Sequence, residues 1–315
     1  MRILFVKTSS LGDVVHHLPA VSDAVRAIPG ASIDWVIEEA FAAVAAMHPA
    51  VRRVIPVALR RWRSALWHPA MWSELGAFRR ALAAERYDAV VDTQGLLKSA
   101  LVAKFASGAK HGMDRASARE PCAARFYNAT HAVPRELHAV ERNRRLAAAS
   151  LGYGANGACD YGLRAEGAAP LDAGGPFAVL LTMTSREDKL WPQARWVELG
   201  RLLAARGVKS VLPWGSEAEH GRAERIARGI GEALVPRRFS LEELGRLFRA
   251  ARGVAGGDTG LTHFAAALGA PTVGLYCGSD PALTGLYGCA RAKNLGAPGT
   301  PPAVAEALAS LEAIW

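Results

Sequence analysis

Short apolar runs alternate with helical patterns along most of the chain, and this alternation predicts an α/β protein. Apolar runs bounded by polar residues are typical of buried parallel strands. In the first half we predict five such strands, at residues 3–6, 33–37, 54–57, 89–91 and 110–113. Helical spacing of apolar residues fills the segments between them, at 14–27, 78–86 and 97–106. Strands that alternate with helices form right-handed βαβ units and an open, twisted sheet.

The alternation stops after Leu151 and resumes at Phe177. Seven glycines and Pro170 fill the interval, a composition typical of a linker. We therefore predict a first domain at 1–155, a linker at 156–176 and a second domain at 177–315. In the second domain the same patterns predict strands at 177–181, 209–212, 252–255 and 272–276, and helices at 194–206, 217–229, 241–250, 261–268 and 302–314. The last helix is a candidate to pack back on the first domain.

Two doubly wound, Rossmann-like domains joined by a linker predict a ligand cleft between them. Ligands of such sheets bind outside the carboxyl ends of the strands. The length of 315 residues fits two ordinary α/β cores, and half of the residues are apolar. No apolar run reaches 18 residues, so we expect no membrane-spanning segment.

Positive charge is concentrated in the first half of the chain. Residues 1–150 contain 21 Lys and Arg against 13 Asp and Glu, a net charge of +8. Residues 151–315 contain 17 against 16, a net charge of +1. A field of this kind attracts phosphorylated lipid, acidic sugar, nucleic acid or an anionic membrane face, although a solvated surface without a partner is the plain alternative. No helix-turn-helix, RNA-recognition or zinc-finger pattern accompanies the excess, which disfavours nucleic acid.

The four cysteines give no sign of a metal centre or a disulfide framework. Cys122, Cys159, Cys277 and Cys289 share no close spacing, and no CxxC pair occurs. Idle thiols in a reducing cytosol are the simplest interpretation.

The segment from Lys7 to Asp13 directly follows the first predicted strand. Its Thr and Ser residues form turns, and Gly12 lets the backbone approach a ligand at the start of a helix. The segment is neither GxGxxG nor a P-loop, which argues against a nicotinamide dehydrogenase and a P-loop kinase. Asp13 has two interpretations: it complements the helix dipole, or it is a carboxylate placed to take a proton from an acceptor hydroxyl.

Two segments of the second domain offer a site for a diphosphate. After strand 177–181, Thr184 and Ser185 can bond phosphate oxygens and Lys189 supplies a mobile positive charge, unless this is an ordinary polar loop. After strand 252–255, Thr259 and Gly260 open a helix whose N–H groups can bind an anion. Asp258 is more suited to orienting the loop or binding a sugar hydroxyl. His263 is expected to face the cleft, with core packing as the alternative.

A basic and aromatic segment in the first domain suits an acidic lipid head group. Arg60, Arg61 and Arg63 can bind carboxylate and phosphate groups, and Trp67 and Trp72 suit a membrane interface. No DxD pair of carboxylates occurs in the chain, so we expect the diphosphate to be neutralised by Lys189 and a helix N-terminus, without a metal ion.

Several of these segments resemble one known family. The resemblance covers nearly the whole chain, and the motifs that carry it are KTSSLGD at 7–13, IPVALRRWR at 55–63, DTQGLLK at 92–98, KHGMD at 110–114, AREP at 118–121, HAVER at 138–142, EDKLWP at 187–192, LPWG at 212–215 and DTGLTH at 258–263. They are similar to the lipopolysaccharide heptosyltransferases of glycosyltransferase family 9. The RRWR and KHGMD motifs point to type I members of that family.

The resemblance implies a GT-B fold, an inverting and metal-independent transfer of heptose, and no cofactor. It implies ADP-L-glycero-D-manno-heptose as donor and the inner Kdo of Kdo₂-lipid A as acceptor, with a monomer working peripherally on the cytoplasmic face of the inner membrane. Type II, which adds the second heptose, is the near alternative. A non-catalytic module that binds sugar nucleotide or anionic lipid is the distant one.

The resemblance also assigns roles to residues. Asp13 is implied as general base and Lys189 as the second catalytic residue. The donor is implied to contact Ser9, Thr184, Ser185, Lys189, Glu219, Phe239, Asp258, Thr259, Gly260 and His263. The acceptor is implied to contact Ser10, Arg60, Arg61, Arg63, Lys98 and Arg119. Three features depart from the family pattern: Gly256-Gly257, Phe239 and the stretch 154–175.

Overall fold

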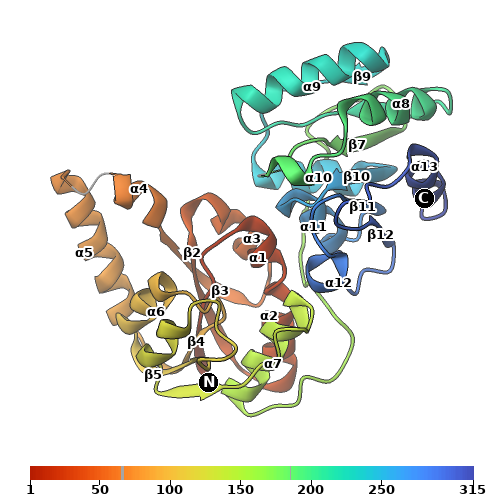
Figure 1. The fold of residues 1–315 in the computed structure, drawn as a ribbon. Helices are drawn as coiled ribbons and strands as arrows, with labels where there is room; N and C mark the ends of the chain where they lie inside the picture. The colour runs from red at the N-terminus through yellow and green to blue at the C-terminus, as the bar shows by residue number, and fades with distance from the viewer. Residues whose placement is uncertain (65–66, 185) are drawn as a thin grey trace. The chain divides into compact units, whose positions relative to one another are not determined.

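The computed structural model describes residues 1–64, 67–184 and 186–315 and divides the chain into two compact units. The first unit is Met1–Leu163 and the second is Arg164–Trp315. Each unit contains one six-stranded sheet whose strands all pair in parallel, with helices packed around it (Figure 1). The α/β class predicted from the sequence is confirmed. The predicted linker, 156–176, spans the division between the units.

The first sheet has the strand order β3-β2-β1-β4-β5-β6. Its strands are β1 (Arg2–Val6), β2 (Ser32–Glu38), β3 (Val51–Val57), β4 (Arg86–Asp92), β5 (Ser107–Met113) and β6 (Ala129–His131). Its helices are α1 (Leu11–Val15), α2 (Leu18–Ala27), α3 (Ala42–Ala46), α4 (Leu59–Ser64), α5 (Pro69–Ala83), α6 (Leu97–Lys104) and α7 (Ala139–Leu151), with 3₁₀ turns η1 (Glu39–Phe41) and η2 (Pro121–Phe126). After its exposed first residue, Arg2, the central strand β1 is apolar and buried, because helices cover both faces of the sheet.

Two predicted helices of the first unit were wrong in extent. The expected helix 14–27 is two helices, α1 and α2, because Pro19 has no N–H with which to continue the helical hydrogen bonding. The expected helix 78–86 ends at Ala83, and Arg86 already opens β4.

The second sheet has the strand order β12-β11-β10-β7-β8-β9. Its strands are β7 (Phe177–Leu181), β8 (Lys209–Val211), β9 (Ala233–Leu234), β10 (Gly253–Gly257), β11 (Thr272–Tyr276) and β12 (Ala292–Gly296). Its helices are α8 (Gln193–Ala204), α9 (Glu217–Ile230), α10 (Leu241–Ala250), α11 (Gly260–Ala267), α12 (Pro281–Thr284) and α13 (Val304–Glu312), with the 3₁₀ turn η3 (Glu187–Lys189).

The last helix, α13, belongs to the core of the second unit. Ala307 and Leu311 are fully buried there, in one cluster with Leu199 of α8 and Val273 of β11. The apolar face of this helix is thus occupied within the second unit.

The strand order reverses once in each sheet. The chain runs outward from β1 to β3 and then returns to place β4 on the other side of β1; in the same way it runs from β7 to β9 and returns to place β10 beside β7. Ligands of doubly wound sheets bind at such reversals, where the loops after two neighbouring strands diverge. The loops after β1 and β4, and those after β7 and β10, are therefore the places to look for a site.

Among the described residues, no helix combines the length and the apolar character needed to cross a membrane.

A buried ion pair joins α2 to α7 in the first unit. Arg144 Nε lies 2.6 Å from Asp23 Oδ2, and the two side chains are only 5% and 3% exposed. Arg144 also binds Glu141 at 2.7 Å and the carbonyl oxygen of Gly157 at 2.9 Å. Arg26, at the surface, pairs with the same Asp23.

We predict that Arg144→Met lowers the free energy of unfolding of the first unit by about 3 kcal/mol, because Asp23 stays buried with only the half-exposed Arg26 as its cation. Urea denaturation measures the loss. The double variant Asp23→Leu/Arg144→Met, which removes both buried charges, should recover most of it; equal losses in the single and double variants would contradict the argument.

Candidate active site

The first cluster lies at the strand-order reversal of the first unit. Asp13 is the third residue of α1, and its Oδ2 accepts the backbone N–H of Ser10 at 2.9 Å. Arg119 Nη1 lies 3.4 Å from the same oxygen. The Asp13 side chain is 27% exposed. Asp13 therefore closes the first turn of its helix, as the first interpretation had it, and also presents a partly exposed carboxylate beside a cation.

The cluster also contains Ser9 and Lys98. Lys98, in the first turn of α6, donates from Nζ to Ser9 Oγ at 3.3 Å. The structure thus brings Ser9, Ser10 and Asp13 from the loop after β1 together with Lys98 and Arg119 from the loops after β4 and β5. Ser9, expected to contact the donor, is in this cluster bonded to a residue expected to contact the acceptor.

A buried lysine beneath this loop was missed as a site residue. Lys7 is 4% exposed, and its Nζ donates to the carbonyl oxygen of Thr93 at 3.0 Å and to Asn143 Oδ1 at 3.4 Å. Desolvation lowers the pKa of Lys7, and the negative charge of Asp13 opposes that shift. The sequence held one sign of this residue: Lys7 directly follows a buried apolar strand. Burial of a charged group is costly unless an opposite charge or hydrogen-bond partners lie near it.

The exposed arginines of α4 differ in the partners that already hold their side chains. Arg61 is held by Glu39 at 3.0 Å and Glu74 at 2.8 Å, and the hydrogen bonds that its guanidinium donates to these carboxylates raise the pKa of Arg61. The Arg60 guanidinium lies 5.6 Å from the centre of the Phe41 ring, and Arg63 is exposed. Arg60 and Arg63 are therefore better placed than Arg61 to bind an external anion.

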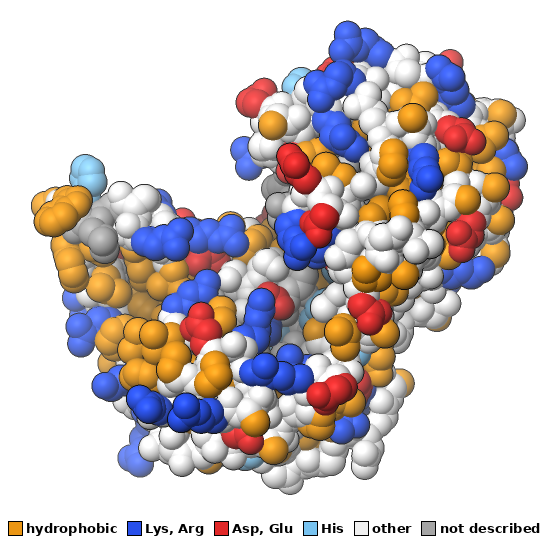
Figure 2. Space-filling view, viewed as in Figure 1, with side chains coloured by type: hydrophobic (Ala, Val, Ile, Leu, Met, Phe, Trp, Pro, Cys, Tyr) orange, Lys and Arg blue, Asp and Glu red, His pale blue; other side chains and the backbone are white. Residues whose placement is uncertain are grey.

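Helix α4 starts close to the loop that carries Asp13. The backbone N–H of Arg60 donates to Glu38 Oε1 at 3.2 Å, and the N–H of Glu38 donates to the Thr8 carbonyl at 3.1 Å. Trp67 is 95% exposed and Trp72 is 59% exposed, while Trp62 is buried. Figure 2 shows basic side chains gathered on the side of the first unit that carries α4, next to hydrophobic side chains at the start of α5.

The second cluster lies at the strand-order reversal of the second unit. Lys189, which follows β7, pairs with Asp258, which follows β10, at 2.6 Å. His263 Nε2 lies 3.4 Å from Asp258 Oδ1, and Ser279 donates to Oδ2. Burial alone would raise the pKa of Asp258, but the hydrogen bonds from His263, Lys189 and Ser279 together hold it well below the usual range. Asp258 orients its neighbours, as one of the sequence interpretations had it.

Glycines allow the loops of this cluster to approach one another. A Cβ on Gly256 would lie 2.1 Å from Thr262 Oγ1, and one on Gly257 would lie 2.8 Å from Thr184 Cγ2. A Cβ on Gly278 would lie 2.6 Å from the carbonyl oxygen of Asp188. The departure from the family pattern at Gly256-Gly257 is therefore accommodated by Thr262 and Thr184, which fill the space that side chains would take.

Thr184, Ser185 and Thr259 were also predicted to bind the diphosphate. Thr184 Oγ1 donates to the Arg186 carbonyl oxygen at 2.7 Å. Because this bond uses the hydroxyl proton, the Thr184 hydroxyl can act toward a ligand only as a hydrogen-bond acceptor. Thr259 precedes Gly260, the first residue of α11. Ser185 lies outside the described residues.

Glu219 lies after β8, the neighbour of β7, and Phe239 lies after β9, the neighbour of β8. Glu219 Oε2 accepts the backbone N–H of Gly215 at 2.6 Å, and Phe239 is 8% exposed beneath Arg237, whose guanidinium carbon lies 5.0 Å from the ring centre. The order β10-β7-β8-β9 thus sets Asp258, Lys189, Glu219 and Phe239 along one edge of the sheet. An elongated ligand could contact all four loops.

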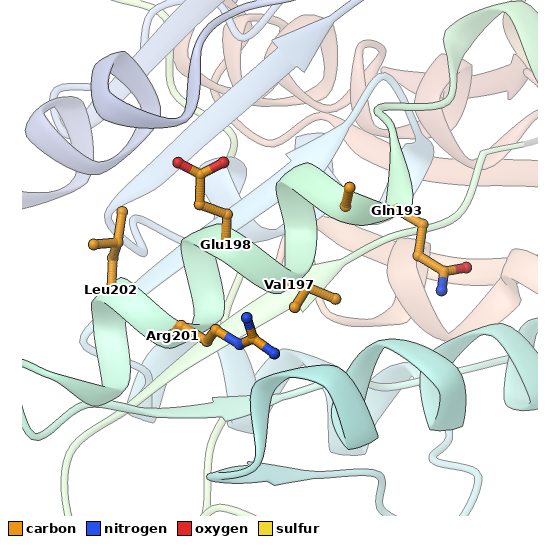
Figure 3. Close-up of a pocket in the computed structure, with 6 residues that line it drawn as sticks. Gln193, Val197, Glu198, Arg201 and Leu202 are labelled. Carbon is orange, nitrogen blue, oxygen red and sulfur yellow. The ribbon is translucent and has the colours of Figure 1, made fainter.

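A pocket of about 580 Å³ lies elsewhere, on the outer side of α8 (Figure 3). Its lining residues are Gln193, Ala194, Val197, Glu198, Arg201 and Leu202. It includes none of the predicted site residues, and all of its lining comes from one helix. A second pocket, of about 780 Å³, has arginines Arg115 and Arg125 in its lining and flanks the loop that carries Arg119.

Similar proteins are known for nearly the whole chain. Lipopolysaccharide heptosyltransferase 1 of Escherichia coli K12 is 50% identical over 292 residues, which cover 91% of each chain. The protein of the same name from Pseudomonas aeruginosa is 49% identical over 290 residues, 91% of this chain and 82% of that one. The solved structure of the Escherichia coli heptosyltransferase WaaC with ADP matches with a TM-score of 0.92 at 45% identity and covers all of both chains.

Two further findings bear on fold and family. The structure of Escherichia coli ADP-heptose lps heptosyltransferase II matches with a TM-score of 0.78 at 22% identity, over 100% of this chain and 98% of that one, which supports the fold alone. The family described as glycosyltransferase family 9 (heptosyltransferase) matches residues 75–305. The GT-B fold class is confirmed, and the chain belongs to glycosyltransferase family 9.

Proposed function

We propose that this enzyme transfers L-glycero-D-manno-heptose from ADP-heptose to the inner Kdo of Kdo₂-lipid A, with inversion at the anomeric carbon. The observation that carries the proposal is the pair of clusters: a carboxylate among cations in the first unit, and a lysine beside a helix N-terminus in the second. The named relatives support it, since those 48–50% identical are called lipopolysaccharide heptosyltransferase 1 and one solved WaaC structure carries ADP-2-deoxy-2-fluoro heptose.

The acceptor half of the reaction belongs to the first cluster. Asp13 takes the proton of the Kdo 5-hydroxyl as that oxygen forms its bond to the anomeric carbon. Lys98 and Arg119 bind acidic groups of the acceptor, and Arg119 Nη1 lies 3.4 Å from Asp13 Oδ2. Ser10 holds the Asp13 carboxylate in place through its backbone N–H.

The donor half belongs to the second cluster. The bond from the anomeric carbon to the diphosphate breaks, and its electron pair goes to the leaving ADP. Lys189 and the N–H groups at the start of α11 meet the growing negative charge. Glu219 binds the ribose hydroxyls and Phe239 lines the adenine site, in the order in which β8 and β9 follow β7. Thr184, Thr259 and His263 complete the sugar and phosphate contacts.

The proposal requires each unit to bind one substrate and the two units to close on both. Closure would exclude water, which competes with the acceptor for the donor. The arginines of α4 and the exposed Trp67 and Trp72 support a peripheral position at the cytoplasmic face of the inner membrane. We propose a monomer. Type I activity is favoured over type II because the type II structure is only 22% identical.

Mass spectrometry of the acceptor tests the function. Kdo₂-lipid A incubated with enzyme and ADP-heptose should gain one heptose, and the gain should persist after chelation with EDTA, because Lys189 and backbone N–H groups replace a metal ion. No gain in mass would refute the function, a requirement for a heptosylated acceptor would indicate type II activity, and loss of turnover in EDTA that Mg²⁺ restores would refute metal independence. Release of ADP excludes a mere binding module.

Asp13→Asn should lower kcat by about a hundredfold or more and leave ADP binding to the second unit unchanged. Asparagine keeps an oxygen that can accept the Ser10 N–H, so the first turn of α1 is preserved. Steady-state kinetics and calorimetric titration with ADP measure the two effects. Asp160→Asn is the matched control, since Asp160 also accepts a backbone N–H, from Gly162, but lies outside the cluster. A kcat near that of the unmodified enzyme would remove Asp13 from the base role.

The double variant Arg60→Ala/Arg63→Ala should raise the KM for Kdo₂-lipid A about tenfold and leave the KM for ADP-heptose unchanged, because these arginines have no carboxylate partner among the described residues. Arg61→Ala is the matched control; its effect should be smaller because Glu39 and Glu74 already hold that side chain. An unchanged acceptor KM in the double variant would show that α4 does not contact the acceptor.

A further inference from the structure

Gln94 lies at the centre of the first cluster without a role in the reaction described so far. It is the second residue after β4, at the strand-order reversal, and only 2% of it is exposed. Its side-chain oxygen Oε1 accepts two backbone N–H groups, from Thr8 at 3.2 Å and from Ser9 at 3.3 Å. Gln94 therefore fixes the loop that leads from β1 to Asp13.

The two backbone donors settle which way the amide is turned. Both neighbours are N–H groups, so the oxygen of the amide must face them and the Nε2 group must face away. Nε2 carries two N–H donors, and within the part of the chain that the structure describes it has no protein acceptor. Nε2 is not among the enclosed polar atoms of the described residues, so its two donors can reach a ligand or water.

A second set of bonds holds Gln94 itself. The Gln94 backbone N–H donates to Asp92 Oδ1 at 2.9 Å, while Asp92 Oδ2 accepts from Ser99 at 2.8 Å and from the Tyr127 hydroxyl at 2.7 Å. Asp92 is fully buried, and burial raises its pKa although these bonds oppose the shift. The loop that carries Gln94 is thus anchored to α6 and to the segment before β6.

The groups around Gln94 indicate what the ligand would be. Ser9, bonded to Gln94 through its N–H, is bonded through its hydroxyl to Lys98. The next residue, Gly95, accepts the backbone N–H of Glu120 at 3.0 Å, and a Cβ on Gly95 would lie 3.5 Å from the Arg119 nitrogen. One cation, Lys98, thus bonds a residue that Gln94 holds, and the backbone of a second, Arg119, lies beside the residue that follows Gln94. An anion is the ligand that these two cations favour.

We propose that Gln94 is a further acceptor-binding residue. Its Oε1 fixes the backbone of Thr8 and Ser9, and its Nε2 donates a hydrogen bond to a carboxylate of the acceptor sugar. This deepens the proposed function and rests on it. The carboxylate is thereby held by a neutral donor as well as by Lys98 and Arg119. The two cations neutralise its charge, and the directional hydrogen bond from Gln94 fixes its position.

Gln94→Glu separates ligand binding from loop support. The new carboxylate still offers oxygens to the Thr8 and Ser9 N–H groups but has no donor and repels an anion. The KM for the acceptor should rise about tenfold or more, while the dissociation constant of ADP and the melting temperature stay unchanged. Gln193→Glu is the matched control, since Gln193 is the only other glutamine of the chain and lies on α8. An unchanged acceptor KM in Gln94→Glu would overturn the proposal.

An esterified acceptor tests the carboxylate directly. The KM of the unmodified enzyme and that of Gln94→Glu are each measured for the de-acylated acceptor and for its carboxylate methyl ester. The KM of Gln94→Glu divided by that of the unmodified enzyme should be closer to one for the ester than for the free acid. A ratio that stays equal for both acceptors would show that Gln94 acts only on the loop. Absence of transfer by the unmodified enzyme would refute the function itself.

Discussion

The reversal of strand order in two parallel sheets is the constraint on which the site depends. Parallel pairing puts the carboxyl ends of all strands at one edge, and the reversal separates the loops after two neighbouring strands so that polar groups can gather there. In the first unit the loops after β1 and β4 bring Asp13, Gln94 and Lys98 together. In the second unit the loops after β7 and β10 pair Lys189 with Asp258. Each unit thus carries its own cluster of polar residues at the carboxyl edge of its sheet.

The two clusters solve different electrostatic problems. In the first, Asp13 is 27% exposed and pairs with the more exposed Arg119, while the buried Lys7 adds a second positive charge nearby. In the second, Asp258 is 8% exposed and Lys189 is 19% exposed. Burial of the Asp258 carboxylate would be costly without partners, and the bonds from Lys189, His263 and Ser279 compensate for that cost.

Patterns that depend on neighbouring residues were predictable, and pairings across the chain were not. Strands β7 and β11 are buried throughout and were predicted at their observed bounds, and the motifs around Asp13 and Asp258 marked loops that do carry clusters. The end of β10 was missed because glycine is a weak strand former. The ion pair between Lys189 and Asp258 joins residues 69 positions apart, and the Gln94 bonds to Thr8 and Ser9 also span most of the first domain, so only folding reveals them.

Because Lys189 is paired with Asp258, an anion that binds at the second cluster must compete with this carboxylate for the ammonium group. When such an anion leaves, the pair with Asp258 can re-form, so the lysine always has a counter-charge within the protein. The pair therefore weakens the binding of any anion there and favours its departure.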